Sequence, residues 1–439
     1  MATALLDEAL KNGASYAEFF VYDLQVAEAA LRGYSAELNQ SKSKIYAIRT
    51  LCEGCWGVAS GQRLSKWLVK EALSRALKAR AYSDRRLRLA SRKPAQGSFA
   101  FIGEEPICLA EAISKELIEV FKELRASHID FSEIVVIASR LGKAMTSSDG
   151  VNAYELRDLI DLSISVAGRN LVSSACIGWS GGLMVGWRDL VERTVKSLVE
   201  RLKAKQKAKL LNPLLRGSKF KVILADEAAC AFIHEAVGHV LEADVLMEHG
   251  YGFKPTKLRG CEELTVCDDP SMPRGYGSYR FDDEGVEAKP KLLVDRGRVV
   301  GLLHTRWTAA EMGVEPMGNG RGVFFAPKSM PSNLVVSRGS WSVDEMVEET
   351  REGFYVEGLN KAEVYGGAVI LYPDIAWYVK KGEVLEPVLL EEIRIPLRTA
   401  LSVVDAVGKS GFTFRPSVEK GLPISECSPP LRLSMAYVR

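Results

Sequence analysis

Helical and strand patterns are segregated along this chain, and that segregation limits the folds open to it. Residues 64–83 and 187–211 carry apolar side chains at helical spacing, whereas residues 16–25 and 44–61 have the pattern of strands. From residue 219 onwards the sequence becomes rich in strands, with hairpin turns predicted at Asp295–Gly297 and Lys381–Gly382. Because strands and helices are grouped instead of alternating, the pattern predicts an α+β fold.

The length of the chain indicates more than one domain. A chain of 439 residues exceeds one ordinary hydrophobic core. The first half repeats an order of helix, strands and helix, and Pro213 with the turn after it marks a boundary. We therefore predict an N-terminal α+β domain over residues 1–212 and a β-rich C-terminal domain over residues 213–439. Residues 82–107 lack periodicity and are expected to form a loop.

Composition excludes several classes of function. The formal net charge is +2, which is too small for a nucleic-acid or membrane-surface protein. No apolar run approaches the roughly 20 residues that a membrane helix needs. Asp7 and Glu8 interrupt the first apolar stretch, so it does not resemble a signal peptide. Eight scattered cysteines do not suggest a disulfide framework, and we expect a cytoplasmic protein.

The segment AFIHEAVGHVLEAD, residues 231–244, contains a histidine pair with an unusual spacing. His234 and His239 are five residues apart, which on a regular α-helix separates them by about 140° around the axis. A π-bulge, or a loosening of the helix at Gly238, would let both imidazoles face one metal ion. Glu235 could then act as general base towards a water that the metal activates. The alternative is a pair of polar residues on the solvent face of a helix.

Several motifs in the chain resemble those of one enzyme family. HEAVGHVLEAD is similar to the HExxxH signature of the TldD/PmbA metallopeptidases, specifically the TldD type, and MGVEPMGNGR and GKSG follow in the family's order. The resemblance covers nearly the whole chain. It implies that His234 and His239 bind one Zn²⁺ per chain and that Glu235 is catalytic.

The third zinc ligand does not carry over from the family. The family's cysteine stands directly before the Gly-Lys-x-Gly block, and here that position is Val407. We expect Cys427 to replace it if a hairpin brings this thiol back to the site. Nearby alternatives are Glu242, Asp244 and His249, and a further alternative is a degenerate site.

The resemblance also implies a substrate and a partner. The family's enzymes cut extended, unfolded peptides, and we expect Gly318, Asn319, Arg321 and Asn333 to help hold such a peptide. The chain would form a homodimer or a heterodimer with a PmbA-type subunit, without nucleic acid or membrane. The leading hypothesis is a zinc-dependent peptidase, and the alternative is a non-catalytic subunit that binds peptides or shapes a chamber.

Overall fold

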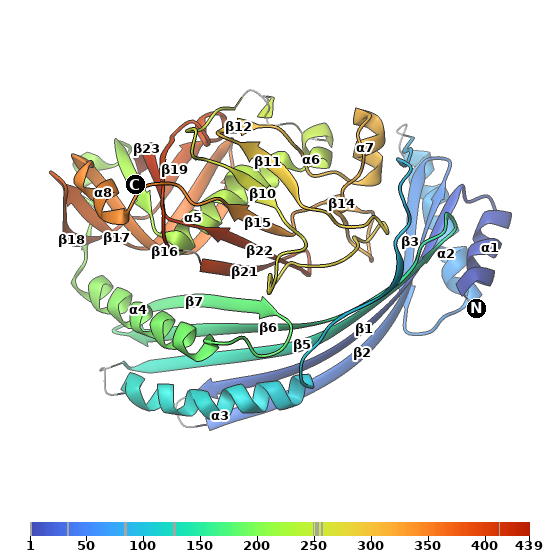
Figure 1. Cartoon of the computed structure of the whole chain (residues 1–439), viewed down its shortest axis with the longest axis horizontal. Helices are drawn as coiled ribbons and strands as arrows, with labels where there is room; N and C mark the ends of the chain where they lie inside the picture. The colour runs from blue at the N-terminus through green and yellow to red at the C-terminus, as the bar shows by residue number, and fades with distance from the viewer. Residues whose placement is uncertain are drawn as a thin grey trace.

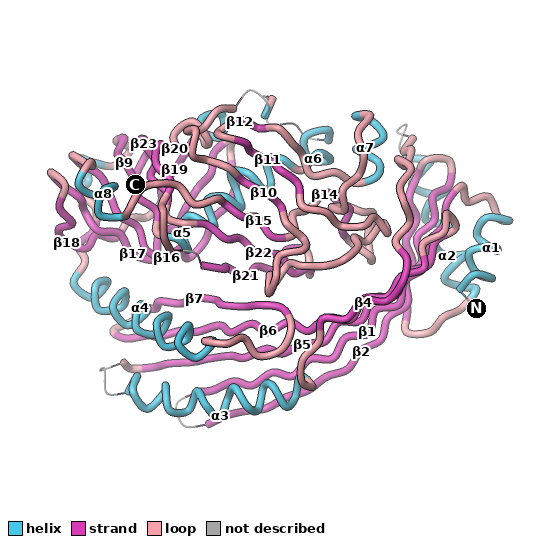
Figure 2. Tube along the Cα trace, viewed as in Figure 1, coloured by secondary structure: helices cyan, strands magenta, loops and turns pink. Residues whose placement is uncertain are grey.

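The computed structural model describes residues 2–32, 35–82, 86–125, 129–248, 250, 254–255, 258–411 and 413–439. It shows a long curved sheet from the first part of the chain, with a more compact body of sheets and helices seated in its concave side (Figures 1 and 2). Strands and helices are mixed without regular alternation, so the predicted α+β class is confirmed.

The curved sheet contains seven strands in the order β3-β2-β1-β5-β6-β4, with β7 also paired to β6. Their bounds are β1 Tyr16–Arg32, β2 Ser35–Cys52, β3 Cys55–Gly61, β4 Gln96–Phe101, β5 Phe131–Ser147, β6 Asn152–Gly168 and β7 Leu171–Ser180. The expectation of a loop over residues 82–107 was wrong in part, because β4 lies there and pairs in parallel with β6. This short strand has an almost wholly exposed sequence, QGSFAF, so it lacks the apolar alternation that identifies a strand.

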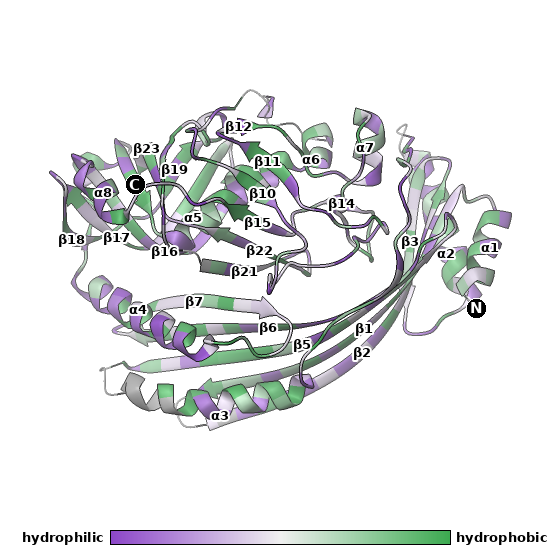
Figure 3. Cartoon of the chain, viewed as in Figure 1, coloured by the Kyte–Doolittle hydropathy of each residue, from purple (hydrophilic) through white to green (hydrophobic). Residues whose placement is uncertain are grey.

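Four helices accompany this sheet. They are α1 Ala2–Lys11, α2 Lys66–Tyr82, α3 Pro106–Arg125 and α4 Trp187–Lys207. In α4 the buried residues Val191, Val195, Leu198 and Leu202 recur at helical spacing, and Figure 3 shows hydrophobic and hydrophilic residues interleaved along this helix. Helix α3 packs on β1 and β5, where Ile134 and Val136 lie in the same core. Among the described helices, none is long and apolar enough to cross a membrane.

The rest of the chain forms two larger sheets and a small two-stranded one. The eight-stranded sheet contains β8 Lys209–Leu210, β9 Lys219–Leu224, β16 Glu352–Tyr365, β17 Ala368–Lys380, β18 Glu383–Leu389, β19 Ile393–Pro396, β20 Val404–Val407 and β23 Leu431–Val438. The six-stranded sheet contains β10 Val266–Asp268, β11 Lys291–Asp295, β12 Arg298–Val299, β15 Asn333–Val336, β21 Thr413–Glu419 and β22 Leu422–Ser428. Strands β13 Gly320–Arg321 and β14 Lys328–Ser329 pair with each other. The hairpins predicted at Asp295–Gly297 and Lys381–Gly382 are confirmed as β11–β12 and β17–β18.

One buried helix links these two sheets. Helix α5, Asp226–Ile233, follows β9 directly and contacts β16 and β17 of one sheet and β21 and β22 of the other. Its residues Ala228 to Ile233 are all buried, which is the pattern of a helix enclosed on every side. Short helices α6 Ala243–Glu248, α7 Arg306–Met312 and α8 Val343–Glu348 complete the body. The layers therefore hold the end of α5 rigidly in the interior.

Buried ion pairs join the curved sheet to the body. Arg49 of β2 is fully buried, pairs with Glu18 of β1 and donates to the backbone carbonyls of Gly322 and Asp283. Lys143 of β5 donates to the Asp283 carboxylate at 3.0 Å. Because buried charges are stable only when paired, these contacts fix how the sheet and the body meet.

Candidate metal centre

The two histidines lie on a helical turn that is one residue wider than an α-turn. Residues His234–Gly238 form a π-helical turn at the end of α5, and the backbone N–H of His239 donates to the carbonyl of His234. This hydrogen bond spans five residues, so the turn offsets the extra residue between the histidines. The two rings stand 4.7 Å apart between centroids, nearly perpendicular to each other. The π-bulge, the first of the two predicted distortions, is the one that the structure contains.

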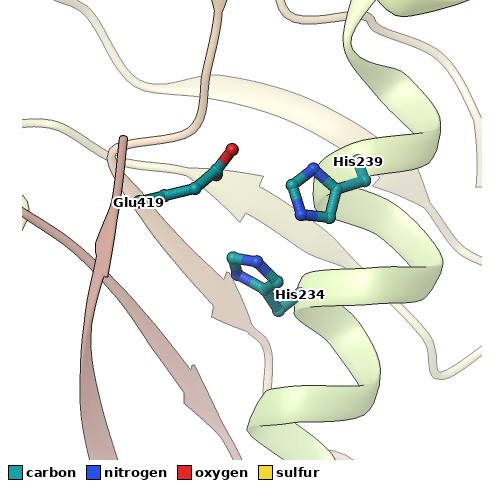
Figure 4. Close-up of side chains that lie close together, drawn as sticks. All are labelled: His234, His239 and Glu419. Carbon is teal, nitrogen blue, oxygen red and sulfur yellow. The ribbon is translucent and has the colours of Figure 1, made fainter. Parts of the chain in front are cut away.

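A third side chain points at the same space from another part of the fold. Ligand atoms of His234, His239 and Glu419 all lie within 4.8 Å of one another. Glu419 is the last residue of β21, at the β21–β22 hairpin, and Figure 4 shows its carboxylate directed towards the two imidazoles. Two imidazoles and one carboxylate are a donor set that suits zinc with a further position open for water or substrate.

Each histidine is oriented by its own carboxylate. The Nδ1 of His234 lies 2.6 Å from Oε1 of Glu426, and the Nδ1 of His239 lies 3.0 Å from Oε1 of Glu242. A carboxylate at Nδ1 keeps the proton on that nitrogen and leaves the lone pair on Nε2. The arrangement is the one that metal-binding histidines commonly have, and it makes each Nε2 a better ligand.

The electrostatic environment favours a cation between the rings. Burial lowers the pKa of His239, but the hydrogen bond and charge of Glu242, with Glu419 and Glu235, outweigh it and raise that pKa to about 9. Burial raises the pKa of Glu426, yet the charges and hydrogen bonds of His234 and Arg415 outweigh it and lower that pKa. The carboxylates therefore stabilise positive charge here, whether it is carried by a proton or by a metal ion.

Glu235 follows His234 in the same π-helical turn, and its charge acts on the imidazole of His239. Its side chain is buried, with 7% of the residue exposed. Within the described ranges, no hydrogen bond or ion pair to its carboxylate is found. A buried carboxylate normally has a partner, because desolvation of its charge is costly. Its lack of one suits a group that receives a proton from a bound molecule.

The structure does not bring Cys427 to the histidines. Cys427 lies in β22 immediately after Glu426, and successive side chains of a strand point to opposite faces. Since Glu426 faces His234, Cys427 faces away, and burial raises the pKa of its thiol so that it stays protonated. The β21–β22 hairpin does reach the histidines, but the side chain that it places there is Glu419 and not Cys427. Val407 lies in β20, buried in the core of the body.

The other proposed ligands have different positions. Glu242 orients His239 through Nδ1. Asp244 is buried and accepts a hydrogen bond from the backbone of Ser329. His249 lies outside the described residues. Among the residues that the structure describes, His234, His239 and Glu419 form a group of side chains that could hold a metal ion.

The residues expected to hold a peptide are instead engaged within the protein. Gly318 has a φ of 89°, and a side chain there would collide with the backbone of Ala288. Asn319, Arg321 and Asn333 are at most 2% exposed. The amide of Asn319 donates to Asp268 and the guanidinium of Arg321 donates to the carbonyl of Pro331.

Asn333 has the same internal role. Its amide donates to the carbonyl of Asp269, and its amide oxygen accepts from the backbone of Gly277. These side chains therefore build the loop, and Arg321, at 2% exposed, is too buried to meet a substrate carboxylate.

Sequence reasoning missed Glu419 and Glu426, because neither belongs to a local motif. His234 and Glu426 are 192 residues apart, and only the pairing of β22 with β15 and β21 brings them together. The one available signal was the Glu-Lys-Gly turn between two apolar runs, which marks a hairpin tip but not a metal ligand.

Comparison with known proteins places this site in a family. Residues 217–436 match the model of the PmbA/TldA metallopeptidase C-terminal domain, a span that includes the histidines and Glu419. The chain belongs to the PmbA/TldD metallopeptidase family. The resemblance read from the sequence is thereby confirmed.

Curated relatives of this PmbA/TldD member are named metalloproteases. One from Methanocaldococcus jannaschii is 29% identical over 393 residues, 86% of each chain. One from Methanothermobacter thermautotrophicus is 27% identical over 426 residues, 92% of this chain and 91% of the relative. A protein named zinc metalloprotease TldD homolog, from Saccharolobus solfataricus, is 29% identical over 208 residues, 45% of this chain and 46% of the relative.

Solved structures share the fold. A putative modulator of DNA gyrase from Bacteroides thetaiotaomicron has a TM-score of 0.73 at 18% identity, covering 100% of this chain and 97% of that one. TldE from Thermococcus kodakarensis also has a TM-score of 0.73, at 17% identity and 99% coverage of both chains. At these identities the likeness establishes the architecture alone.

Proposed function

We propose that this protein is a zinc-dependent peptidase that cleaves extended or unfolded peptides. The observation that carries the proposal is the convergence of His234, His239 and Glu419, with Glu235 beside them. Two imidazoles oriented through Nδ1 and one carboxylate fit zinc by their chemistry. The names of the curated relatives support the same metal and the same class of reaction.

The chain's own residues have separable roles in this reaction. Zinc, when bound, would supply a Lewis acid and lower the pKa of a coordinated water. Glu235 accepts the proton of the attacking water and delivers it to the leaving amine. Glu426 and Glu242 hold the imidazoles in one tautomer and orientation, so that no reorganisation is needed during the reaction.

An extended substrate fits the enclosed position of the centre. The histidines lie at the end of a helix sandwiched between two sheets, and the curved N-terminal sheet faces the β21–β22 hairpin that carries Glu419 (Figure 1). Because His234 and Glu235 are at most 8% exposed, the surface of a folded protein would not reach them, which favours an extended chain as the substrate. The proposal retains the division into residues 1–212 and 213–439. Strand β8 lies before this boundary in the sequence, but it pairs with β18 of the C-terminal part.

The proposed assembly is a homodimer or a heterodimer with a PmbA-type subunit, acting in the cytoplasm. The structural likeness to a TldE protein is consistent with a partner of the same fold. The competing hypothesis, a non-catalytic subunit, rests on Val407 at the position of the family's cysteine. Glu419 supports the peptidase hypothesis, because its carboxylate offers a third ligand in place of that cysteine.

Zinc content and cleavage test the proposal together. The protein is purified without chelator, and zinc per chain is measured for the wild type and for His234→Ala, Glu419→Ala, Cys427→Ala and Glu235→Gln. We expect about one zinc per chain in the wild type, Cys427→Ala and Glu235→Gln, and loss of zinc in the other two. Cleavage of an unfolded polypeptide should disappear in Glu235→Gln. A wild-type protein without zinc, or cleavage that survives in Glu235→Gln, would overturn the proposal.

A further inference from the structure

An apolar cavity of about 480 Å³ lies between the curved sheet and the body, beside the proposed zinc ligand. Its floor is formed by β1, β2 and β5 of the sheet, and its roof by Phe324, Phe325 and the β21–β22 hairpin. A volume of this size is within the roughly 300–1,000 Å³ range of pockets that hold small ligands. The cavity is distinct from the loop residues that sequence analysis assigned to the substrate.

The floor of the cavity is a largely apolar patch on the face of the sheet opposite α3, with Ser43 and Ser139 among its apolar side chains. On β5, Val136 and Ala138 are buried in the core under α3, so Ile137 and Leu141 point to the other face and into the cavity. On β1, Leu24 lies directly across from Leu141 on one side and from Ser43 on the other. An antiparallel face left open to water is normally polar. An apolar floor here indicates a surface that meets an apolar partner.

The roof keeps apolar side chains uncovered over this floor. Val418 is 63% exposed although it lines the cavity, whereas Phe324, which is 44% exposed, packs edge-to-face on Tyr22 of the floor with 5.8 Å between the ring centroids. If the cavity were only a gap in the packing of two domains, Val418 would also lie against the opposite wall. The exposure of Val418 marks apolar surface that is available for a ligand.

The same hairpin connects the cavity to the metal centre. Val418 and Lys420 line the cavity, and Glu419 between them faces the histidines from the other face of the hairpin. The Lys420 ammonium is paired with the Glu419 carboxylate. A chain that extends around the hairpin tip would have its backbone at the histidines and a side chain further along in the cavity.

The polar groups of the cavity do not select a charged ligand. The Asp161 carboxylate accepts from the hydroxyl of Tyr276 at 2.9 Å, and the Tyr22 hydroxyl lies 3.3 Å from Asp283. Among the described residues that line the cavity, the cationic side chain is Lys420, which is paired with Glu419. With these groups already engaged, the binding energy available to a ligand comes from burial of apolar surface.

We propose that this cavity binds a large apolar side chain, such as Phe or Leu, of the extended peptide that is cleaved at the metal centre. The inference rests on the proposed peptidase function and adds a preference to it: substrates with a large apolar residue near the cleaved bond bind tightest. Burial of such a side chain corresponds to a gain in affinity of about tenfold or more.

Binding to an inactive protein tests the cavity separately from cleavage. The zinc-loaded full chain with Glu235→Gln is titrated with two fluorescent, unstructured peptides that differ only in a central Phe or Asn. We expect the Phe peptide to bind at least about ten times more tightly. Adding Ser139→Trp, which fills the floor opposite Val26, should abolish this difference, because it occupies the cavity. The matched control Ser60→Trp, at an exposed serine of β3 outside the cavity, should leave it unchanged.

Leu24→Asn provides a second variant if Ser139→Trp does not fold, because it makes the floor polar without adding volume. A Phe preference below about twofold, one that persists in both cavity variants, or no binding of either peptide overturns the inference. Zinc content and wild-type cleavage are measured independently. Cleavage without a Phe preference would refute the cavity alone, whereas a Phe preference without zinc or cleavage would refute the peptidase function alone.

Discussion

Replacing Glu426 with glutamine tests whether this buried carboxylate prepares His234 for metal binding. Glu426 is 1% exposed, with Oε1 at 2.6 Å from Nδ1 of His234 and Oε2 at 3.2 Å from Nη1 of Arg415. Glutamine preserves the size of the side chain and an oxygen that can accept from Nδ1. It removes the negative charge that makes the imidazole more basic and that balances the partly buried Arg415 guanidinium.

The expected magnitude follows from this geometry. Loss of a carboxylate that holds a metal-binding histidine costs roughly 10–100-fold in metal affinity. At about 1.4 kcal/mol for each factor of ten, this corresponds to about 1.4–2.8 kcal/mol of zinc-binding free energy. The contact is short and buried, so we expect the upper half of that range.

Competition against a chromophoric zinc chelator at fixed pH measures the effect. Glu391→Gln serves as the control, since this exposed glutamate is paired with Arg216 and contacts neither histidine. His234→Ala defines the complete loss of the ligand. If Glu426→Gln bound zinc within about twofold of the wild type while His234→Ala did not bind it, the orienting role of Glu426 would be refuted.

Three further outcomes follow from particular contacts. Removing the carboxylate of the buried Arg49–Glu18 pair with Glu18→Ala should lower the free energy of unfolding by about 3–5 kcal/mol, because Arg49 is fully buried; a loss below about 1 kcal/mol in urea denaturation would contradict this. Burial lowers the pKa of His304 to about 4 from an ordinary value of 6.5. As pH falls below 6.5, His304 is therefore protonated in the unfolded chain before it is protonated in the folded one, so stability falls between pH 6.5 and 4. His304→Gln should flatten this part of a profile of melting temperature against pH. Gly238→Ala should retain zinc, because Gly238 has a φ of −51° that any residue can adopt. It should lower the free energy of unfolding by about 1–3 kcal/mol, because the added methyl would lie 3.0 Å from Leu334. Loss of zinc in that variant would show that the π-turn needs glycine.

Local patterns were sufficient for several elements, although not for β4, and for the part of the site that lies on one helix. The apolar spacing of residues 187–211 predicted α4, and the glycine turns predicted both body hairpins. The five-residue interval between His234 and His239, read against the geometry of an α-helix, required a distortion, and the π-turn supplies it. These features depend on neighbours within a few residues, which the sequence displays directly.

Tertiary structure alone decided what completes the centre. Glu419 and Glu426 reach the histidines because strand pairing places the β21–β22 hairpin against α5, and strand alternation turns Cys427 away. The burial of Arg321 and Asn333 also could not be predicted from the sequence, because the composition of a loop does not indicate which of its side chains have hydrogen-bond partners inside the protein. The apolar cavity also belongs to this class, because its floor and its roof come from distant parts of the chain. Contacts between residues far apart in the sequence depend on the packing of whole layers, and no local pattern encodes that packing.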